Sequence, residues 1–164
     1  MSTLTAGDPA PAFELSTTDG SRLSLPSQLK KGPVLLAFYK SSCPVCQFTF
    51  PFLERIHKAY PADQVTVLGI SQDDDRDTKD FMQEYGLTFP LAIDDRGYPA
   101  SNAYGLTNVP SLFLVTPDQK IRLSSVGFSK KDIERVSREL AEHVGKPILQ
   151  VFRTDEVIPE YKPG

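Results

Sequence analysis

The feature that most restricts the fold of this chain is a short apolar run, residues 34–39, followed almost at once by Cys43-Pro44-Val45-Cys46. The run is too short for a helix and lacks polar alternation, which is typical of a strand buried on both faces of a sheet. Pro44 suits the first position of a helix, where a backbone N–H would have no partner in any case. The sequence therefore predicts a buried strand that turns directly into a helix carrying both cysteines at its start.

Strand-like and helix-like segments alternate along the rest of the chain. The turn signal Asp19-Gly20 predicts a hairpin with arms over residues 12–16 and 22–25. Further strands are expected over residues 65–70, 89–94, 112–115 and 121–126, and helices from the cysteines to residue 60, up to residue 85, over 98–104 and over 130–144. Pro51 is expected to kink or split the first of these helices. This order predicts an α/β fold with a mixed sheet.

Length and charge limit the classes of protein to consider. The chain has 164 residues, which fits one domain over residues 1–145, and we expect the proline-containing tail, residues 146–164, to pack on it. The net charge of -3 offers no basic surface for nucleic acid. No apolar run approaches the roughly 20 residues that span a bilayer. The first residues lack a basic and apolar secretory signal, so a cytoplasmic location is expected, without nucleic-acid or membrane partners.

The two cysteines are the only ones in the chain, and two residues separate them. A bridge closing so small a loop would stabilise the fold little, so chemistry is the better explanation for the pair. The reactive species of a cysteine is its thiolate, which the unpaired N–H groups and partial positive charge of a helix N-terminus stabilise. We therefore expect Cys43 to attack a substrate disulfide and Cys46, one turn further on, to resolve the mixed disulfide.

The cysteine pair also allows two interpretations other than enzymatic turnover. A zinc site would need two more ligands, but the chain offers only His57 and His143 and no second pair of cysteines. Neither a metal nor any other cofactor is therefore expected. The chain could also be a redox sensor or binding module, in which the disulfide changes a surface without turnover.

Several of these motifs occur together in a known family. The lead-in over residues 7–15 (GDPAPAFEL), the Asp19-Gly20 turn, the strand over residues 34–39 and the Cys43–Cys46 pair resemble the redoxin branch of the thioredoxin superfamily. This branch includes the alkyl hydroperoxide reductase/thiol-specific antioxidant (AhpC/TSA) proteins and the TlpA/ResA-like thiol-disulfide oxidoreductases. The resemblance runs over residues 7–144. It implies a thioredoxin-like fold with a central mixed sheet, an N-terminal β-hairpin extension and an inserted helix-strand segment near residues 78–94.

The resemblance also implies a function and a substrate surface. It points to a thiol-disulfide oxidoreductase that acts on a protein thiol or disulfide partner and receives electrons from another dithiol protein. By the same resemblance, Val109-Pro110 is the cis-proline loop that faces the cysteines and pairs with substrate backbone, with Ser42 and Pro44 beside it. The oligomeric state is left open.

The chain departs from the pattern of these relatives around the cysteines. Ser42 stands where a tryptophan usually precedes the first cysteine. The acidic residue that helps the inner thiol lies six positions before the first cysteine in thioredoxin and three positions after the second cysteine in ResA-like proteins. In this chain these two positions hold Ala37 and Thr49. Proton transfer to Cys46 would then rely on water, Thr49 or Lys40. Lys40 could also stabilise the Cys43 thiolate electrostatically.

The second enzymatic reading is a peroxiredoxin-like thiol peroxidase that reduces hydroperoxides. Peroxiredoxins carry a Pro-x-x-x-Thr/Ser-x-x-Cys motif, in which the hydroxyl helps to polarise the peroxide. If Cys46 is aligned with the peroxidatic cysteine, Cys43 occupies the hydroxyl position and Lys40 lies near the proline position. If Cys43 is aligned instead, no such proline lies upstream. Thiol-disulfide exchange is therefore the leading prediction.

Overall fold

The computed structural model describes residues 2–164 and has a five-stranded mixed sheet at its centre. The strands lie in the order β5 (Leu91–Ile93), β4 (Thr66–Ser71), β3 (Val34–Tyr39), β6 (Ser111–Val115) and β7 (Ile121–Val126). β3, β4 and β5 are parallel to one another, whereas β6 and β7 are antiparallel to their neighbours. The predicted α/β fold with a mixed sheet is therefore confirmed.

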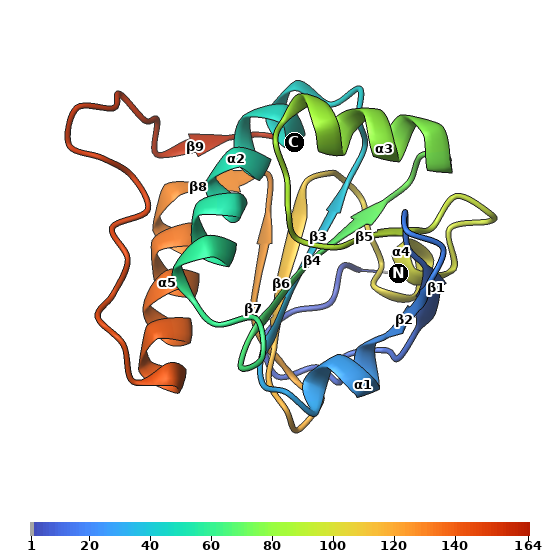
Figure 1. Cartoon of the computed structure of the whole chain (residues 1–164), viewed down its shortest axis with the longest axis horizontal. Coiled ribbons are helices and arrows are strands. Elements are labelled where there is room, and N and C mark those ends of the chain that lie inside the picture. Colours follow the sequence, from blue (N-terminus) through green and yellow to red (C-terminus); the bar gives the residue numbers. More distant parts are fainter. Residues whose placement is uncertain (1) are drawn as a thin grey trace.

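Helices cover both faces of this sheet (Figure 1). Within the described residues the helices are α1 (Leu25–Leu29), α2 (Pro44–Ala59), α3 (Asp75–Glu84), α4 (Pro99–Ala103) and α5 (Lys130–Val144). Alternate residues of β3 point to opposite faces: Leu35, Ala37 and Tyr39 join the core under α2, α3 and α5, and the residues between them join the core under α1 and α4. Burial on both faces explains why the β3 sequence is apolar throughout.

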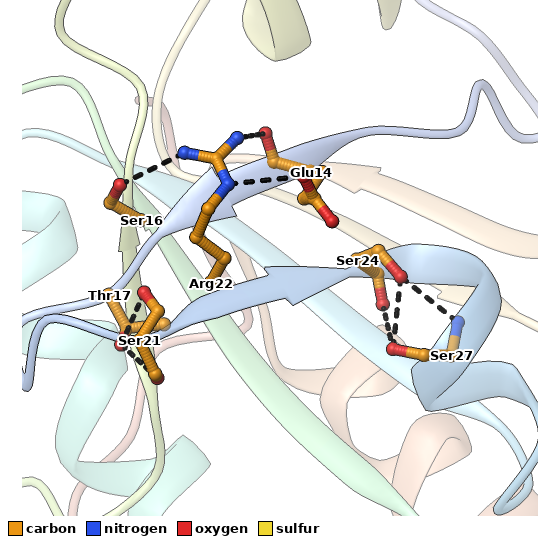
Figure 2. A network of polar contacts seen from close by, with 7 residues as sticks. All are labelled: Glu14, Ser16, Thr17, Ser21, Arg22, Ser24 and Ser27. Atoms are coloured by element: carbon orange, nitrogen blue, oxygen red, sulfur yellow. Dashed lines mark hydrogen bonds and ion pairs between the residues drawn. The ribbon is translucent and has the colours of Figure 1, made fainter.

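The N-terminal hairpin consists of β1 (Glu14–Ser16) and β2 (Arg22–Ser24), as the Asp19-Gly20 turn predicted. Figure 2 shows its polar network, in which the Arg22 guanidinium contacts the Glu14 carboxylate at 3.1 Å and donates to the Ser16 hydroxyl at 3.2 Å. The α1 helix follows β2 directly and was not predicted. The sequence indicates this helix only weakly, because it is five residues long. Its N-cap is Ser24, whose hydroxyl accepts a hydrogen bond from the Ser27 N–H.

Helix α2 remains continuous across Pro51, so the predicted split does not occur. Its buried face supplies Phe50, Leu53 and Ile56 to the core, all fully buried. Tertiary packing of this apolar face outweighs the backbone hydrogen bond that proline removes. The helix thereby holds its N-terminus, and the cysteines on it, against the carboxyl end of β3.

The tail returns along α5 to the edge of the domain. Val151 and Phe152 are buried in the core beneath α2 and α5, and β9 (Tyr161–Lys162) pairs with β8 (Phe128–Ser129) in an antiparallel ladder. Arg55 of α2 contacts the Glu156 carboxylate at 2.7 Å and donates to the Val151 carbonyl at 2.8 Å. Among the described residues, no helix is both long enough and apolar enough to cross a membrane.

The ion pair between Arg55 and Glu156 predicts a pH dependence of stability. Hydrogen bonds from the Arg55 guanidinium and then from the Arg153 N–H lower the pKa of Glu156 from 4.5 to about 2. A carboxyl group with a lowered pKa stabilises the folded state above its unfolded pKa and loses that contribution as the pH falls through the folded value. We expect wild type to melt above Glu156→Gln at pH 6, with the difference closing between pH 4.5 and 2.

Thermal unfolding monitored by circular dichroism from pH 2 to pH 7 measures this difference. Glu160→Gln, which removes a carboxylate from an exposed position in the same tail, is the matched control and should follow wild type across the range. A difference between wild type and Glu156→Gln that stays constant down to pH 2 would contradict the assignment.

Candidate functional site

Cys43 lies where β3 ends and α2 begins, as the residue that caps the helix N-terminus. Its backbone is extended, with φ −85° and ψ 115°, and its Sγ accepts a hydrogen bond from the Cys46 N–H at 3.3 Å. Pro44 follows as the first helical residue. A sulfur in this position faces the unpaired N–H groups and the partial positive charge at the start of the helix. The predicted placement of the pair at a helix start is confirmed.

The two sulfurs differ sharply in their exposure. Cys43 is half-buried, whereas Cys46, one turn further on, is fully buried, and both are free thiols. Burial raises the pKa of the Cys46 thiol well above its ordinary value, and its hydrogen bond with Cys43 raises it further. The inner sulfur is therefore kept as a thiol at neutral pH, while the outer sulfur is within reach of solvent.

The loop before β6 supplies the third side of the site. The peptide bond between Val109 and Pro110 is cis, as the resemblance implied, and Pro110 is buried. The Val109 carbonyl accepts a hydrogen bond from the Cys43 Sγ–H at 3.5 Å. The Pro110 carbonyl accepts one from the Gly127 N–H at 2.8 Å, which ties this loop to the end of β7. The structure thus brings together the cysteines and the Val109-Pro110 loop across 66 positions of sequence.

The other predicted site residues differ in their exposure and in their hydrogen bonds. Ser42 and Pro44 are exposed beside Cys43. Lys40 is also exposed and contributes its carbonyl, which accepts from the Cys43 N–H at 3.2 Å. Thr49 is fully buried, and its hydroxyl donates to the Val45 carbonyl of its own helix at 2.7 Å. The Thr49 hydroxyl is therefore engaged within α2.

Two polar residues that were not predicted hold the segment before Cys43. Asp73, just after β4, accepts a hydrogen bond from the Ser41 N–H at 2.7 Å, and the Gln47 side chain donates to the Ser41 carbonyl at 2.9 Å. The next residue, Asp74, caps α3 by accepting a hydrogen bond from the Asp77 N–H. The position of Asp73 could have been predicted from the parallel pairing of β3 and β4, because the residues that follow two parallel strands meet at one edge of the sheet.

The last residues of the tail border the same loop. Gly164 lies so close to Val109 that a Cβ at Gly164 would stand 2.4 Å from the Val109 carbonyl oxygen, and the Asn108 amide donates to the Gly164 carbonyl at 3.4 Å. The Lys162 ammonium lies 5.0 Å from the centre of the Phe48 ring of α2. In Figure 1 the chain accordingly ends close to the N-terminus of α2.

No group of three or more potential metal ligands occurs within residues 2–164.

Comparisons with known proteins agree with this geometry. The chain is 30% identical over 127 residues to the thiol-disulfide oxidoreductase ResA of Bacillus thuringiensis (strain Al Hakam), covering 77% of this chain and 72% of that protein. It superposes with a TM-score of 0.76 and 28% identity on a Chlorobium tepidum structure assigned as a thiol:disulfide interchange protein DsbE, covering 87% of this chain and all of that one. The fold is therefore thioredoxin-like.

The same fold also occurs in a protein named for different chemistry. The peroxidoxin BcpB of Mycobacterium tuberculosis superposes with a TM-score of 0.71 and 23% identity, over 87% of this chain and 97% of that one. The likeness to this protein shows the fold alone. A family model narrows the assignment further, because it matches residues 6–124, from the lead-in through both cysteines and the Val109-Pro110 loop to β7. The chain belongs to the AhpC/TSA family.

Proposed function

We propose that the protein catalyses thiol-disulfide exchange with protein partners, with Cys43 as the attacking thiol and Cys46 as the resolving thiol. The observation that carries this proposal is the asymmetry of the pair: Cys43 is accessible at the start of α2, and Cys46 is buried one turn behind it. A partner disulfide can reach the first sulfur but not the second. The homology to thiol-disulfide oxidoreductases supports the same chemistry.

The reaction proceeds by two exchanges of sulfur. The Cys43 thiolate attacks one sulfur of the partner disulfide, forming a mixed disulfide and releasing the other partner sulfur as a thiolate that takes up a proton. Cys46 then loses its proton, and its thiolate attacks the Cys43 Sγ. The second partner sulfur leaves as a thiolate and is protonated. The partner gains two electrons and two protons, and the protein is left with the Cys43–Cys46 disulfide.

The partner polypeptide is expected to approach across the exposed rim of the site. Ser42 and Pro44 are the exposed neighbours of Cys43 in the chain, and the Val109 carbonyl contacts the Cys43 sulfur, so these residues are the ones we expect the partner to touch. No metal, flavin or nucleotide enters this scheme, and another dithiol protein would return the pair to its reduced form. The cytoplasmic location stays a prediction from the sequence, and cell fractionation would test it.

Parallel assays of insulin-disulfide reduction and hydrogen peroxide consumption test the proposed function, with dithiothreitol as the electron source in both. We expect insulin reduction well above the dithiothreitol background and peroxide consumption close to that background. Peroxide turnover faster than insulin turnover would replace the proposal with a peroxidase. Background rates in both assays, together with a Cys43–Cys46 disulfide that forms and is reduced reversibly, would assign a redox sensor.

A further inference from the structure

The last four residues of the tail lie against the loop that faces the attacking thiol (Figure 1). Residues 161–164, here called the rim segment, begin with β9, which pairs with β8 just after Gly127. The Gly127 N–H donates to the Pro110 carbonyl at 2.8 Å, so the rim segment and the loop before β6 meet at one place. Gly164 then reaches Val109 itself, because a Cβ on Gly164 would collide with the Val109 carbonyl oxygen.

The Val109 carbonyl oxygen has capacity for one more hydrogen bond. A carbonyl oxygen can accept two hydrogen bonds, and among the described residues the one donor to this oxygen is the Cys43 Sγ–H, at 3.5 Å. Gly164, which lies against the same oxygen, is not among its donors. A partner polypeptide that brings its N–H groups to the loop beside Cys43 therefore meets the rim segment next to the acceptor that it would bind.

The contacts that hold the rim segment in place are individually weak. The ladder between β8 and β9 contains two residue pairs. The Lys162 ammonium lies 5.0 Å from the centre of the Phe48 ring, and such cation–π contacts contribute little where the cation is partly exposed. The Asn108 amide donates to the Gly164 carbonyl at 3.4 Å, which is long for a hydrogen bond. A single substitution can therefore release the segment.

We propose that the rim segment is a specificity-determining wall of the site, which limits how closely a partner polypeptide can approach Cys43 from the Val109 side. This inference rests on the proposed exchange reaction and names a substrate class for it. The site favours disulfides on narrow or flexible stretches of chain over disulfides set in a broad folded surface, because bulky neighbours of the attacked sulfur collide with residues 161–164. Small disulfides have no such neighbours and are unaffected by the wall.

Two substitutions of Lys162 separate the position of the segment from its charge. The Lys130 N–H donates to the Glu160 carbonyl at 3.0 Å, and because bonded pairs alternate along an antiparallel ladder, we expect the Lys162 N–H to face β8 as well. Lys162→Pro removes this backbone donor together with the ammonium group. Lys162→Gln removes the ammonium group but keeps the backbone donor, and is the matched control. Buried Val151 and Phe152 anchor the tail upstream, and thermal unfolding establishes that each variant is folded.

Alkylation of Cys43 measures access to the sulfur without any exchange reaction. Each substitution is placed in a Cys46→Ser background, in which Cys43 is the single thiol. The two reagents are N-ethylmaleimide and a maleimide attached to a long polyethylene glycol chain, which share one reactive group and differ in bulk. The ratio of their rate constants reports access, because the intrinsic reactivity of the sulfur affects both reagents equally.

We expect Lys162→Pro to raise the rate constant of the polymer reagent about threefold to tenfold and to leave that of N-ethylmaleimide within about twofold of the parent. Lys162→Gln should stay within about twofold of the parent with both reagents. A polymer reagent that is not accelerated in Lys162→Pro, or two reagents that are accelerated alike, would overturn the inference. An equal gain in Lys162→Gln would also overturn it, because the charge and not the position of the segment would then control access.

The same substitutions in the protein with both cysteines connect access to turnover. Lys162→Pro should reduce insulin about threefold to tenfold faster than wild type and should reduce the small neutral disulfide of 2-mercaptoethanol at the wild-type rate. If wild type reduces insulin and Lys162→Pro is no faster, the inference is wrong. If neither protein reduces insulin while the polymer reagent is accelerated as expected, the proposed function fails and the effect of the rim segment on access to Cys43 stands.

Discussion

Replacing Cys43 with serine is expected to lower insulin-disulfide turnover by about a thousandfold or more, to the background of the reductant. A serine hydroxyl at the start of α2 is not ionised at neutral pH and cannot attack a disulfide. Cys46→Ser should also stop turnover, but for a different reason. The attack by Cys43 remains possible in this variant, and the mixed disulfide it forms has no internal thiol to resolve it.

The two variants are therefore distinguished by what accumulates. Each variant is incubated with native insulin, whose disulfides are intact, and analysed by non-reducing electrophoresis and mass spectrometry. We expect a covalent adduct on Cys43 in Cys46→Ser and none in Cys43→Ser. Ser42→Ala, which changes an exposed neighbour without removing a sulfur, is the control and should keep most of the activity. An adduct that forms on Cys46 in Cys43→Ser would reverse the assigned roles.

Replacing Asp94 with alanine is expected to destabilise the fold by about 3–5 kcal/mol. The Asp94 carboxylate is 1% exposed and accepts hydrogen bonds from the Ala100 N–H at 3.0 Å and from the Ser101 N–H and hydroxyl, both at 2.8 Å. Alanine would leave these buried donors at the start of α4 without partners, and an unsatisfied buried donor is more destabilising than a lost surface contact.

Urea denaturation of wild type and variants at pH 7 measures this effect. Asp94→Asn, which keeps one acceptor oxygen, should lose less stability than Asp94→Ala. Asp95→Ala removes the adjacent carboxyl group from a more exposed position and should stay within about 0.5 kcal/mol of wild type. Equal losses from Asp94→Ala and Asp95→Ala would show that the buried bonds at α4 contribute no more than surface charge.

The prediction of the fold from sequence succeeded wherever one segment carried a strong signal of its own. The unbroken apolar run of β3 predicted a central strand, and Asp19-Gly20 predicted the hairpin of β1 and β2. The prediction was weaker where a local preference of the backbone competes with tertiary packing. Pro51 predicted a kinked or split helix, but packing of Phe50 and its neighbours keeps α2 continuous, and α1 is too short to show a period.

The candidate site divides in the same way between local and non-local information. The place of Cys43 at a helix start follows from its neighbours alone, because a buried strand, a short turn and Pro44 specify it within a few residues. The contact of Cys43 with Val109 was expected only from the family resemblance. The contact of Asp73 with Ser41, 32 positions away, was not predicted.

The sequence by itself determined that a cysteine pair stands at the end of a buried strand and at the start of a helix, since those features depend on residues close together in the chain. Only the tertiary structure decided which groups surround that pair. Parallel pairing of β3 with β4 carries Asp73 to the cysteine loop, and antiparallel pairing of β3 with β6 carries Val109 there. Strand order and register depend on how distant apolar faces pack, and no local pattern of residues encodes that choice.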